Sequence, residues 1–313
     1  MDRPAPLQAR EILLLLALWM TCILLGQLVL SATLPRSLNT SLTFERQFTA
    51  ADGHHRQVTI TAWFEKEGNY TTNGNESGTY TLLPQGAIRL HPEGETPYLT
   101  YREIPLRRKI GELLLSNFTV HGAPLLLIAW LLHANGRRWV EAFGLRQGRL
   151  ARIVLGALAA ALLAIPIAMT AKLLSSQVLI QFNHEPVVQQ AVQSVIQAVS
   201  PLEFTLLTFW IIAAAPIAEE CIFRGILYPA IKTSGRPRLA LWVSALLFGA
   251  IHAHWETFLP LTLLGLLLAL LYEKTGNLLA PILTHAFFNL ANLLLIRHPE
   301  WLQQIEQRLS SGP

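Results

Sequence analysis

Long apolar runs separated by short polar segments dominate the chain, and they predict membrane-spanning helices. A spanning helix needs about 20 mostly apolar residues. Such runs occur at 12–32, 111–133, 151–174, 203–228, 238–253, 256–272 and 277–296. Because only helices and closed barrels satisfy their backbone hydrogen bonds in lipid, these runs predict an all-α polytopic helical bundle with about seven spans.

The first run has two interpretations. The apolar region of a cleaved signal peptide is usually about 7–15 residues long. The run from Ile12 to Ala32 is longer, and Leu30-Ser31-Ala32 makes a poor cleavage site. We therefore expect residues 1–34 to form an uncleaved transmembrane anchor, with a cleaved signal peptide as the alternative.

The polar segment 35–109 shows a different periodicity. Val58, Ile60, Ala62 and Phe64 alternate with polar residues, which is typical of a strand. Further β-like runs at 79–83, 87–90 and 98–104 are separated by Asn, Gly and Pro turn signals. The pattern predicts a small β-rich extramembrane domain between the first two spans, of unknown partner. A long, partly ordered loop is the alternative.

Composition and charge support a membrane protein. Hydrophobic residues make up 52% of the 313 residues and charged residues only 14%, against about 25% charged in soluble domains. The net charge of +4 requires no acidic partner, so nucleic-acid binding is not expected. Basic residues after the second and fourth spans place both connections in the cytoplasm by the positive-inside rule. Alternation then puts the β-rich domain outside, although Arg107, Arg108 and Lys109 on that side disagree.

Three charged residues interrupt the fourth apolar run: Glu219, Glu220 and Arg224. A charge at the bilayer centre costs at least ~2.5–3.5 kcal/mol, so such groups are paired or line a wet cavity. Glu220 and Arg224 are four residues apart and can pair on one helix face. Glu219 points about 100° away, so we expect it to lack a fixed partner and to be free for acid–base chemistry. The alternative is that all three only hold helices together.

Two later spans contribute His252 and His285, each with a neighbour one turn away. Phe248 precedes His252 and could shield that ring from lipid. Asn289 follows His285 and could donate a hydrogen bond to a developing oxyanion. Either histidine alone would more simply be a packed, hydrogen-bonded core residue. Together with Glu219, they predict a site that activates water.

A metal site is the competing interpretation of the same residues. Two histidines and one glutamate form a known catalytic zinc shell, which here would be Glu219, His252 and His285. The chain contains no His-Glu-x-x-His motif. We therefore expect no cofactor, with zinc on these three residues as the alternative.

In this order, the three motifs resemble the CPBP family of intramembrane proteases, which includes the type II CAAX prenyl endopeptidases and the bacterial Abi proteins. The family pattern is Glu-Glu-x-x-x-Arg, Phe-x-x-x-His and His-x-x-x-Asn/Asp. This sequence supplies every position: Glu219, Glu220, Arg224, Phe248, His252, His285 and Asn289. The resemblance covers about residues 200–296, within a multi-span membrane domain at 110–298 that precedes a C-terminal tail at 299–313.

The resemblance implies a glutamate-dependent intramembrane endopeptidase that cuts a membrane-associated protein or peptide. It implies that Glu219 and His252 activate water, that His285 and Asn289 form the oxyanion side, and that Glu220, Arg224 and Phe248 support them. An integral multi-pass protein of the bacterial plasma (inner) membrane is expected. The alternatives are a non-proteolytic immunity or scaffold protein of the same family and a proton-coupled transporter.

Overall fold

The structure is a computed structural model that describes residues 9–33, 40–49, 55–65, 69–72, 77–83, 87–93, 103–105, 110–182, 189–196, 198 and 200–298. The predicted tail at 299–313 lies outside these residues. The chain divides into two compact units. One is helical and comprises residues 1–24 and 116–313, and the other comprises residues 25–115.

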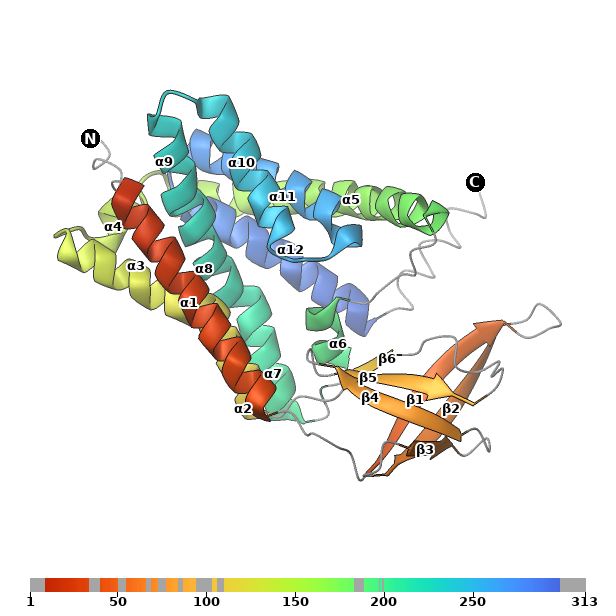
Figure 1. The fold of residues 1–313 in the computed structure, drawn as a ribbon. Helices are drawn as coiled ribbons and strands as arrows, with labels where there is room; N and C mark the ends of the chain where they lie inside the picture. The colour runs from red at the N-terminus through yellow and green to blue at the C-terminus, as the bar shows by residue number, and fades with distance from the viewer. Residues whose placement is uncertain are drawn as a thin grey trace, which may run out of the picture. The chain divides into compact units, whose positions relative to one another are not determined.

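In the described part of the larger unit, every regular element is a helix (Figure 1). The first helices of the chain are α1 (Ala9–Thr33), α2 (Ile110–Asn117), the π-helix η1 (Phe118–Gly122), α3 (Ala123–Ala134), α4 (Trp139–Ala142) and α5 (Leu150–Gln181). The later ones are α6 (Gln190–Ile196), α7 (Pro201–Phe209), η2 (Trp210–Ala214), α8 (Ala215–Glu220), η3 (Cys221–Leu227), α9 (Tyr228–Thr233), α10 (Pro237–Ala250), α11 (Trp255–Thr275) and α12 (Leu279–Arg297).

Six helical stretches among the described residues are long and apolar enough to cross a membrane. They are Arg10–Leu30, Gly111–Ala134, Leu150–Gln181, Pro201–Thr233, Trp255–Thr275 and Leu279–Arg297. The remaining predicted span, at 238–253, corresponds to α10, which has only 14 residues. At about 1.5 Å per residue, α10 is shorter than the hydrocarbon core of about 30 Å. The predicted class, a polytopic helical bundle with a sheet between the first two spans, is confirmed.

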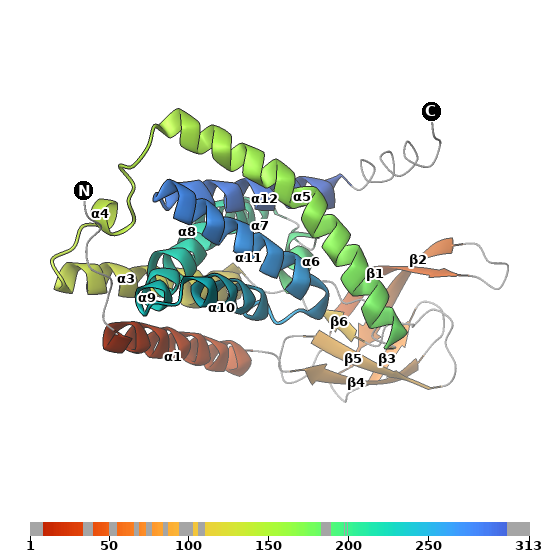
Figure 2. The same ribbon diagram turned by 90° about the horizontal axis from the view of Figure 1, so that it is seen from above.

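A row of small residues lets α5 pack closely against α11 and α12, and both views show the three helices together (Figure 2). The buried residues of α5 that form this row are Ala157, Ala161, Ala164, Ala168 and Ala171. Small side chains allow close approach of helices in lipid, where no hydrophobic force drives them together. The hydroxyl of Thr284 on α12 donates to the Ala157 carbonyl at 3.3 Å.

The 201–233 stretch carries the candidate site and begins at a defined cap. The Ser200 hydroxyl accepts from the Glu203 backbone N–H, and the Glu203 carboxylate accepts from the Ser200 N–H, which is a capping box. Pro201 takes the first helical position, where its missing N–H costs nothing. The stretch then contains two π-helical segments, η2 and η3, on either side of α8.

The smaller unit is built around a six-stranded antiparallel meander in the order β1-β2-β3-β4-β5-β6. Its strands are β1 (Thr40–Thr49), β2 (His55–Phe64), β3 (Asn69–Thr72), β4 (Ser77–Leu83), β5 (Ala87–Pro92) and β6 (Glu103–Pro105). Phe64 and Tyr80 are buried in an edge-to-face contact with ring centroids 5.2 Å apart. The alternation read at 58–64 therefore lies within strand β2, where Ala62 and Phe64 are buried.

Candidate active site

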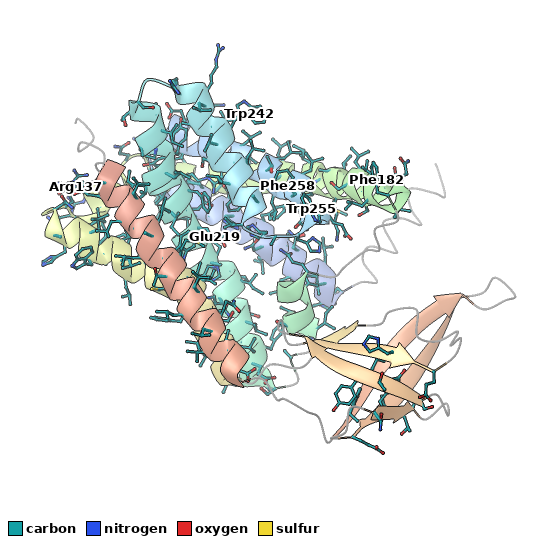
Figure 3. All side chains as sticks on the ribbon, in the orientation of Figure 1. Arg137, Phe182, Glu219, Trp242, Trp255 and Phe258 are labelled. Atoms are coloured by element: carbon teal, nitrogen blue, oxygen red, sulfur yellow. The ribbon has the colours of Figure 1, made fainter. Side chains whose placement is uncertain are left out.

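Two adjacent carboxylates lie inside the helical unit at the end of α8. Glu219 is 7% exposed and Glu220 is fully buried. Figure 3 labels Glu219 among the helices of the larger unit. Burying two charges is costly unless each is paired or hydrogen-bonded. Their partners therefore define what the site can do.

Glu220 belongs to a buried ionic network. Its Oε1 accepts from Nη1 of Arg224 at 3.0 Å, as the spacing of four residues predicted. Arg224 also donates from Nη2 to the Gly265 carbonyl of α11 at 2.9 Å. Its guanidinium carbon lies 4.5 Å from the centroid of the Phe248 ring, a cation–π contact. The arginine therefore joins η3, α10 and α11 around one buried charge.

Glu219 has a fixed partner, contrary to the expectation from helix geometry. Its Oε1 lies 3.3 Å from Nε2 of His121, which belongs to η1. Its Oε2 has no hydrogen-bond partner among the described residues. That second oxygen lies 3.9 Å from Nε2 of His285, beyond hydrogen-bond distance. One carboxylate oxygen is therefore held while the other faces a histidine.

The hydrogen-bond partners assign the tautomers of the two predicted histidines. Nδ1 of His252 lies 2.8 Å from the Phe248 carbonyl, and Nδ1 of His285 lies 3.0 Å from Oε1 of Glu220. A carbonyl and an ionised carboxylate only accept, so each Nδ1 carries the hydrogen. Each Nε2 then presents a lone pair when the ring is neutral. Both histidines lie near enough to Glu219 to interact with it electrostatically.

Phe248 and Asn289 complete the predicted set. The fully buried Phe248 ring packs edge-on against His252 and His285, with centroids 5.3 and 5.5 Å apart. The Asn289 amide donates to the Ile211 carbonyl at 2.9 Å. An amide carries two N–H groups, so one remains available in addition to this bond. The structure thus brings six of the seven predicted residues into one network of contacts, and Asn289 bonds instead to the backbone of η2.

Three π-helical segments supply or position the site. His121 lies in η1, the Ile211 carbonyl lies in η2, and Arg224 lies in η3. A π-turn widens the helix and leaves irregular backbone bonding, and such segments occur frequently at functional sites. Pro216 contributes at the second position of α8, because it has no N–H to donate back into η2.

Two residues of the network were missed by sequence reasoning. His121 contacts Glu219, and Nε1 of Trp210 donates to Nδ1 of His121 at 3.2 Å. A histidine inside the apolar run 111–133 was a visible signal, since such residues are functional candidates by default in membrane spans. Nothing in the run indicated which of the later helices it meets.

A catalytic metal site needs at least three protein donors that converge on one point. Within the part of the chain that the structure describes, no group of three or more His, Cys, Asp or Glu side chains is arranged to hold a metal ion. Glu219, His252 and His285, which the zinc alternative requires, do not form such a group.

The fold and the site define a class: a polytopic membrane protein with a buried glutamate–histidine centre. Residues 201–291 match the family model described as type II CAAX prenyl endopeptidase Rce1-like. Residues 201–291 are therefore similar to this family, and the resemblance inferred from the three motifs is confirmed over that segment.

Curated relatives also match only a limited part of the chain, between 72 and 100 residues. The chain is 35% identical over 100 residues to a Bacillus subtilis protein named "Putative membrane peptidase YdiL", covering 32% of this chain and 39% of the relative. It is 38% identical over 72 residues to the uncharacterized protein YpbD of the same organism, covering 22% and 34%. It is 36% identical over 88 residues to an uncharacterized 24.3 kDa protein of Escherichia coli, covering 26% and 39%. The chain thus spans little more than a third of each relative's length. No solved structure matches it.

Proposed function

We propose that the chain is an intramembrane endopeptidase that hydrolyses a peptide bond of a membrane-associated protein or peptide. One observation carries the proposal. Glu219 is buried in a helical membrane unit, with one oxygen held and the other facing a histidine. Among the described residues, the ionic partners of Glu219 are histidines, which can exchange protons, whereas Glu220 is paired with the permanently charged Arg224.

In this mechanism Glu219 and His252 activate the water. Two acceptors are available for the hydrogens of the water: the free Oε2 of Glu219 and the lone pair on Nε2 of His252. The water oxygen attacks the peptide carbonyl carbon while its proton passes to Glu219. That proton then goes to the leaving amine, which completes hydrolysis with the atoms balanced.

The oxyanion side is formed by His285 and Asn289. The second N–H of the Asn289 amide can donate to the tetrahedral oxygen, and Nε2 of His285 can donate when it is protonated. Glu220 and Arg224 hold His285 in its tautomer, and Phe248 packs against both histidine rings. These three residues support the reaction without touching the substrate.

The substrate and location belong to the same proposal. A site within spanning helices can only reach chains that enter or lie on the lipid bilayer. The bacterial sources of the curated relatives favour the bacterial plasma (inner) membrane. The reaction as written needs no cofactor. A zinc ion on Glu219, His252 and His285 is tested by adding a chelator to the assay below.

The first experiment compares new peptide N-termini in membranes that carry the wild type or Glu219→Gln at equal abundance. The amide nearly preserves the shape of the carboxylate but cannot accept the proton. We expect a set of termini that is present with the wild type and absent with the variant. Glu141→Gln, which changes an exposed carboxylate on α4, is the matched control and should retain every terminus.

The alternatives predict other results. Identical profiles for a folded Glu219→Gln variant and the wild type would contradict proteolysis and favour the immunity or scaffold protein. A proton-coupled transporter would instead lose the pH dependence of transport in the same variant. Activity that disappears with a chelator and returns with zinc would show that a metal takes part.

A further inference from the structure

His121, which contacts Glu219, lies outside the matched family segment. His121 belongs to η1, whereas the family model begins at residue 201. The two residues are 98 positions apart in the chain, and their side chains approach to 3.3 Å. A residue of the second span therefore meets the carboxylate that our proposed mechanism uses.

Trp210 determines which nitrogen of His121 carries the hydrogen. An indole N–H can only donate, and Nε1 of Trp210 lies 3.2 Å from Nδ1 of His121. Nδ1 must therefore accept, and the hydrogen of the neutral ring sits on Nε2. That nitrogen faces Oε1 of Glu219 and donates to it. The chain of donors runs in one direction, from Trp210 through His121 to Glu219.

This tautomer is opposite to that of the other two histidines. His252 and His285 carry the hydrogen on Nδ1, because a carbonyl and a carboxylate accept from them there. They present a lone pair on Nε2, whereas His121 presents a hydrogen. His121 is thus equipped to hold a carboxylate and not to take a proton from water.

The hydrogen bond from His121 to Oε1 of Glu219 also determines where Oε2 of the same carboxylate points. A glutamate side chain rotates about three bonds, and only Oε1 is anchored by a described hydrogen bond. With Oε1 on His121, Oε2 faces Nε2 of His285 at 3.9 Å. Without the anchor, the carboxylate could turn toward other donors and the free oxygen would lose its direction. Misplacement by about 1 Å can cost about 100-fold in rate.

We propose that His121, fixed in its Nε2–H tautomer by Trp210, is a positioning residue that orients Glu219 for catalysis. This inference rests on the proposed peptidase function. It adds to the matched domain a helix and two residues that the three sequence motifs do not include. Its distinguishing claim is that His121 acts as a hydrogen-bond donor and never as a base.

Substitution of His121 by glutamine distinguishes a hydrogen-bond donor from a base at this position. The amide oxygen and nitrogen of Gln are both bonded to one carbon, as Nδ1 and Nε2 of histidine are. Gln can therefore accept from Trp210 and donate to Glu219, but it cannot titrate. We expect His121→Gln to keep most of the rate at which wild-type-specific termini appear. We expect His121→Leu to lose about 10- to 100-fold. His133→Leu, an exposed histidine on α3, is the matched control and should change nothing.

The role of Trp210 is tested by whether its substitution has an effect only when His121 is present. Trp210→Phe removes the indole donor but keeps an aromatic ring, and we expect about a 2- to 10-fold loss, the scale of one ordinary hydrogen bond. In a His121→Leu background the same change should cost nothing further, because Trp210 acts only through His121. Trp130→Phe, at an exposed tryptophan on α3, is the control. Independent, additive losses would contradict the chain of donors.

A readout that does not depend on activity completes the test. ¹⁵N-histidine NMR of the full chain in lipid nanodiscs reports the tautomer of His121, with its signals assigned by their disappearance in His121→Gln. We expect the hydrogen on Nε2 in the wild type and a mixture of tautomers or none of this tautomer in Trp210→Phe. In Glu219→Gln we expect a shift of the signal of that hydrogen.

Hydrogen on Nδ1, full activity of His121→Leu, or a folded but inactive His121→Gln would each overturn the inference. If Glu219→Gln leaves the termini unchanged while the tautomer is as expected, the peptidase function fails and the donor contact stands.

Discussion

Glu219 and Glu220 are adjacent in the chain, yet their surroundings give them different tasks. Glu220 shares Oε1 between Arg224 and His285 at 3.0 Å each, so its charge is neutralised locally. Glu219 has a single histidine donor at 3.3 Å and a free second oxygen. Each carboxylate leaves its Oε2 without a described hydrogen bond, so the difference lies in the partners of Oε1. A carboxylate paired with arginine suits a structural role, and one whose partners are histidines is available for chemistry. The division of labour follows from the partners and not from the residue type.

The ion pair yields a stability prediction at this scale. Arg224→Ala should leave Glu220 as a buried charge without its cation, at a cost of about 3–5 kcal/mol. We expect poor accumulation and a lower apparent melting temperature in detergent, beyond simple inactivity. Arg238→Ala, which removes an exposed arginine on α10, is the matched control. Wild-type melting of Arg224→Ala would show that the pair contributes little.

The candidate site was only partly predictable at the level of residues. The Glu220–Arg224 pair follows from helical spacing, and the structure contains it. The partner of Glu219 does not follow, because periodicity within one helix says nothing about which other helix packs against it. His121 and Trp210 are 89 positions apart, and their contact depends on the packing of η1 against α8 and of η2 against α8.

At the scale of elements, the apolar runs predicted the helices but not their internal breaks. The runs at 111–133 and 203–228 contain η1, η2 and η3, which alter the bonding without changing hydropathy. Among the strands, β2, β4 and β5 were anticipated. The run at 98–104 overlaps β6, and its residues 98–102 lie outside the described part of the chain. β1 was missed although Leu42, Phe44 and Phe48 follow a two-residue period, and the four-residue β3 was missed because it lies between Asn and Gly turn signals.

One close helix approach makes an element-scale prediction. A Cβ placed on Gly265 of α11 would lie 3.0 Å from Cα of Ala245 and 3.2 Å from Nη2 of Arg224. Neither neighbour can easily move, since one is backbone and the other is held by Glu220. Gly265→Ala should lower the free energy of unfolding by about 1–3 kcal/mol through overpacking.

Gly156 on α5 provides the comparison for this substitution, because a Cβ there meets nothing within 4 Å. Gly156→Ala should be neutral or slightly stabilising, since Ala favours a helix by ~0.5–1 kcal/mol over Gly. Melting of both variants in the same detergent isolates the packing term. Equal effects at the two positions would mean that α10 and α11 can separate without cost.

At the scale of the helical unit, three connections meet at one end of the bundle. The Leu278 N–H donates to the Phe143 carbonyl at 3.0 Å, and the Asn277 side chain donates to the Gln147 carbonyl at 2.7 Å. Lys232 at the end of α9 pairs with Glu273 at the end of α11. Gly276, at φ +64, ends α11 in the left-handed conformation that glycine adopts without strain. The loops 135–149, 234–236 and 276–278 therefore lie on the same side.

Because the three connections lie on one side, the positive-inside rule predicts that all three are in the cytoplasm, and this can be tested. Arg138→Cys, Ser234→Cys and Lys274→Cys each place one thiol at an exposed position near one of these connections. Each is made in a chain whose native Cys22 and Cys221 are replaced by Ala. A membrane-impermeant maleimide should leave all three unlabelled in intact bacterial cells and label all three after lysis, because basic connections stay in the cytoplasm. Labelling of all three in intact cells would invert the orientation but keep the bundle, and a disagreement among them would contradict the bundle itself.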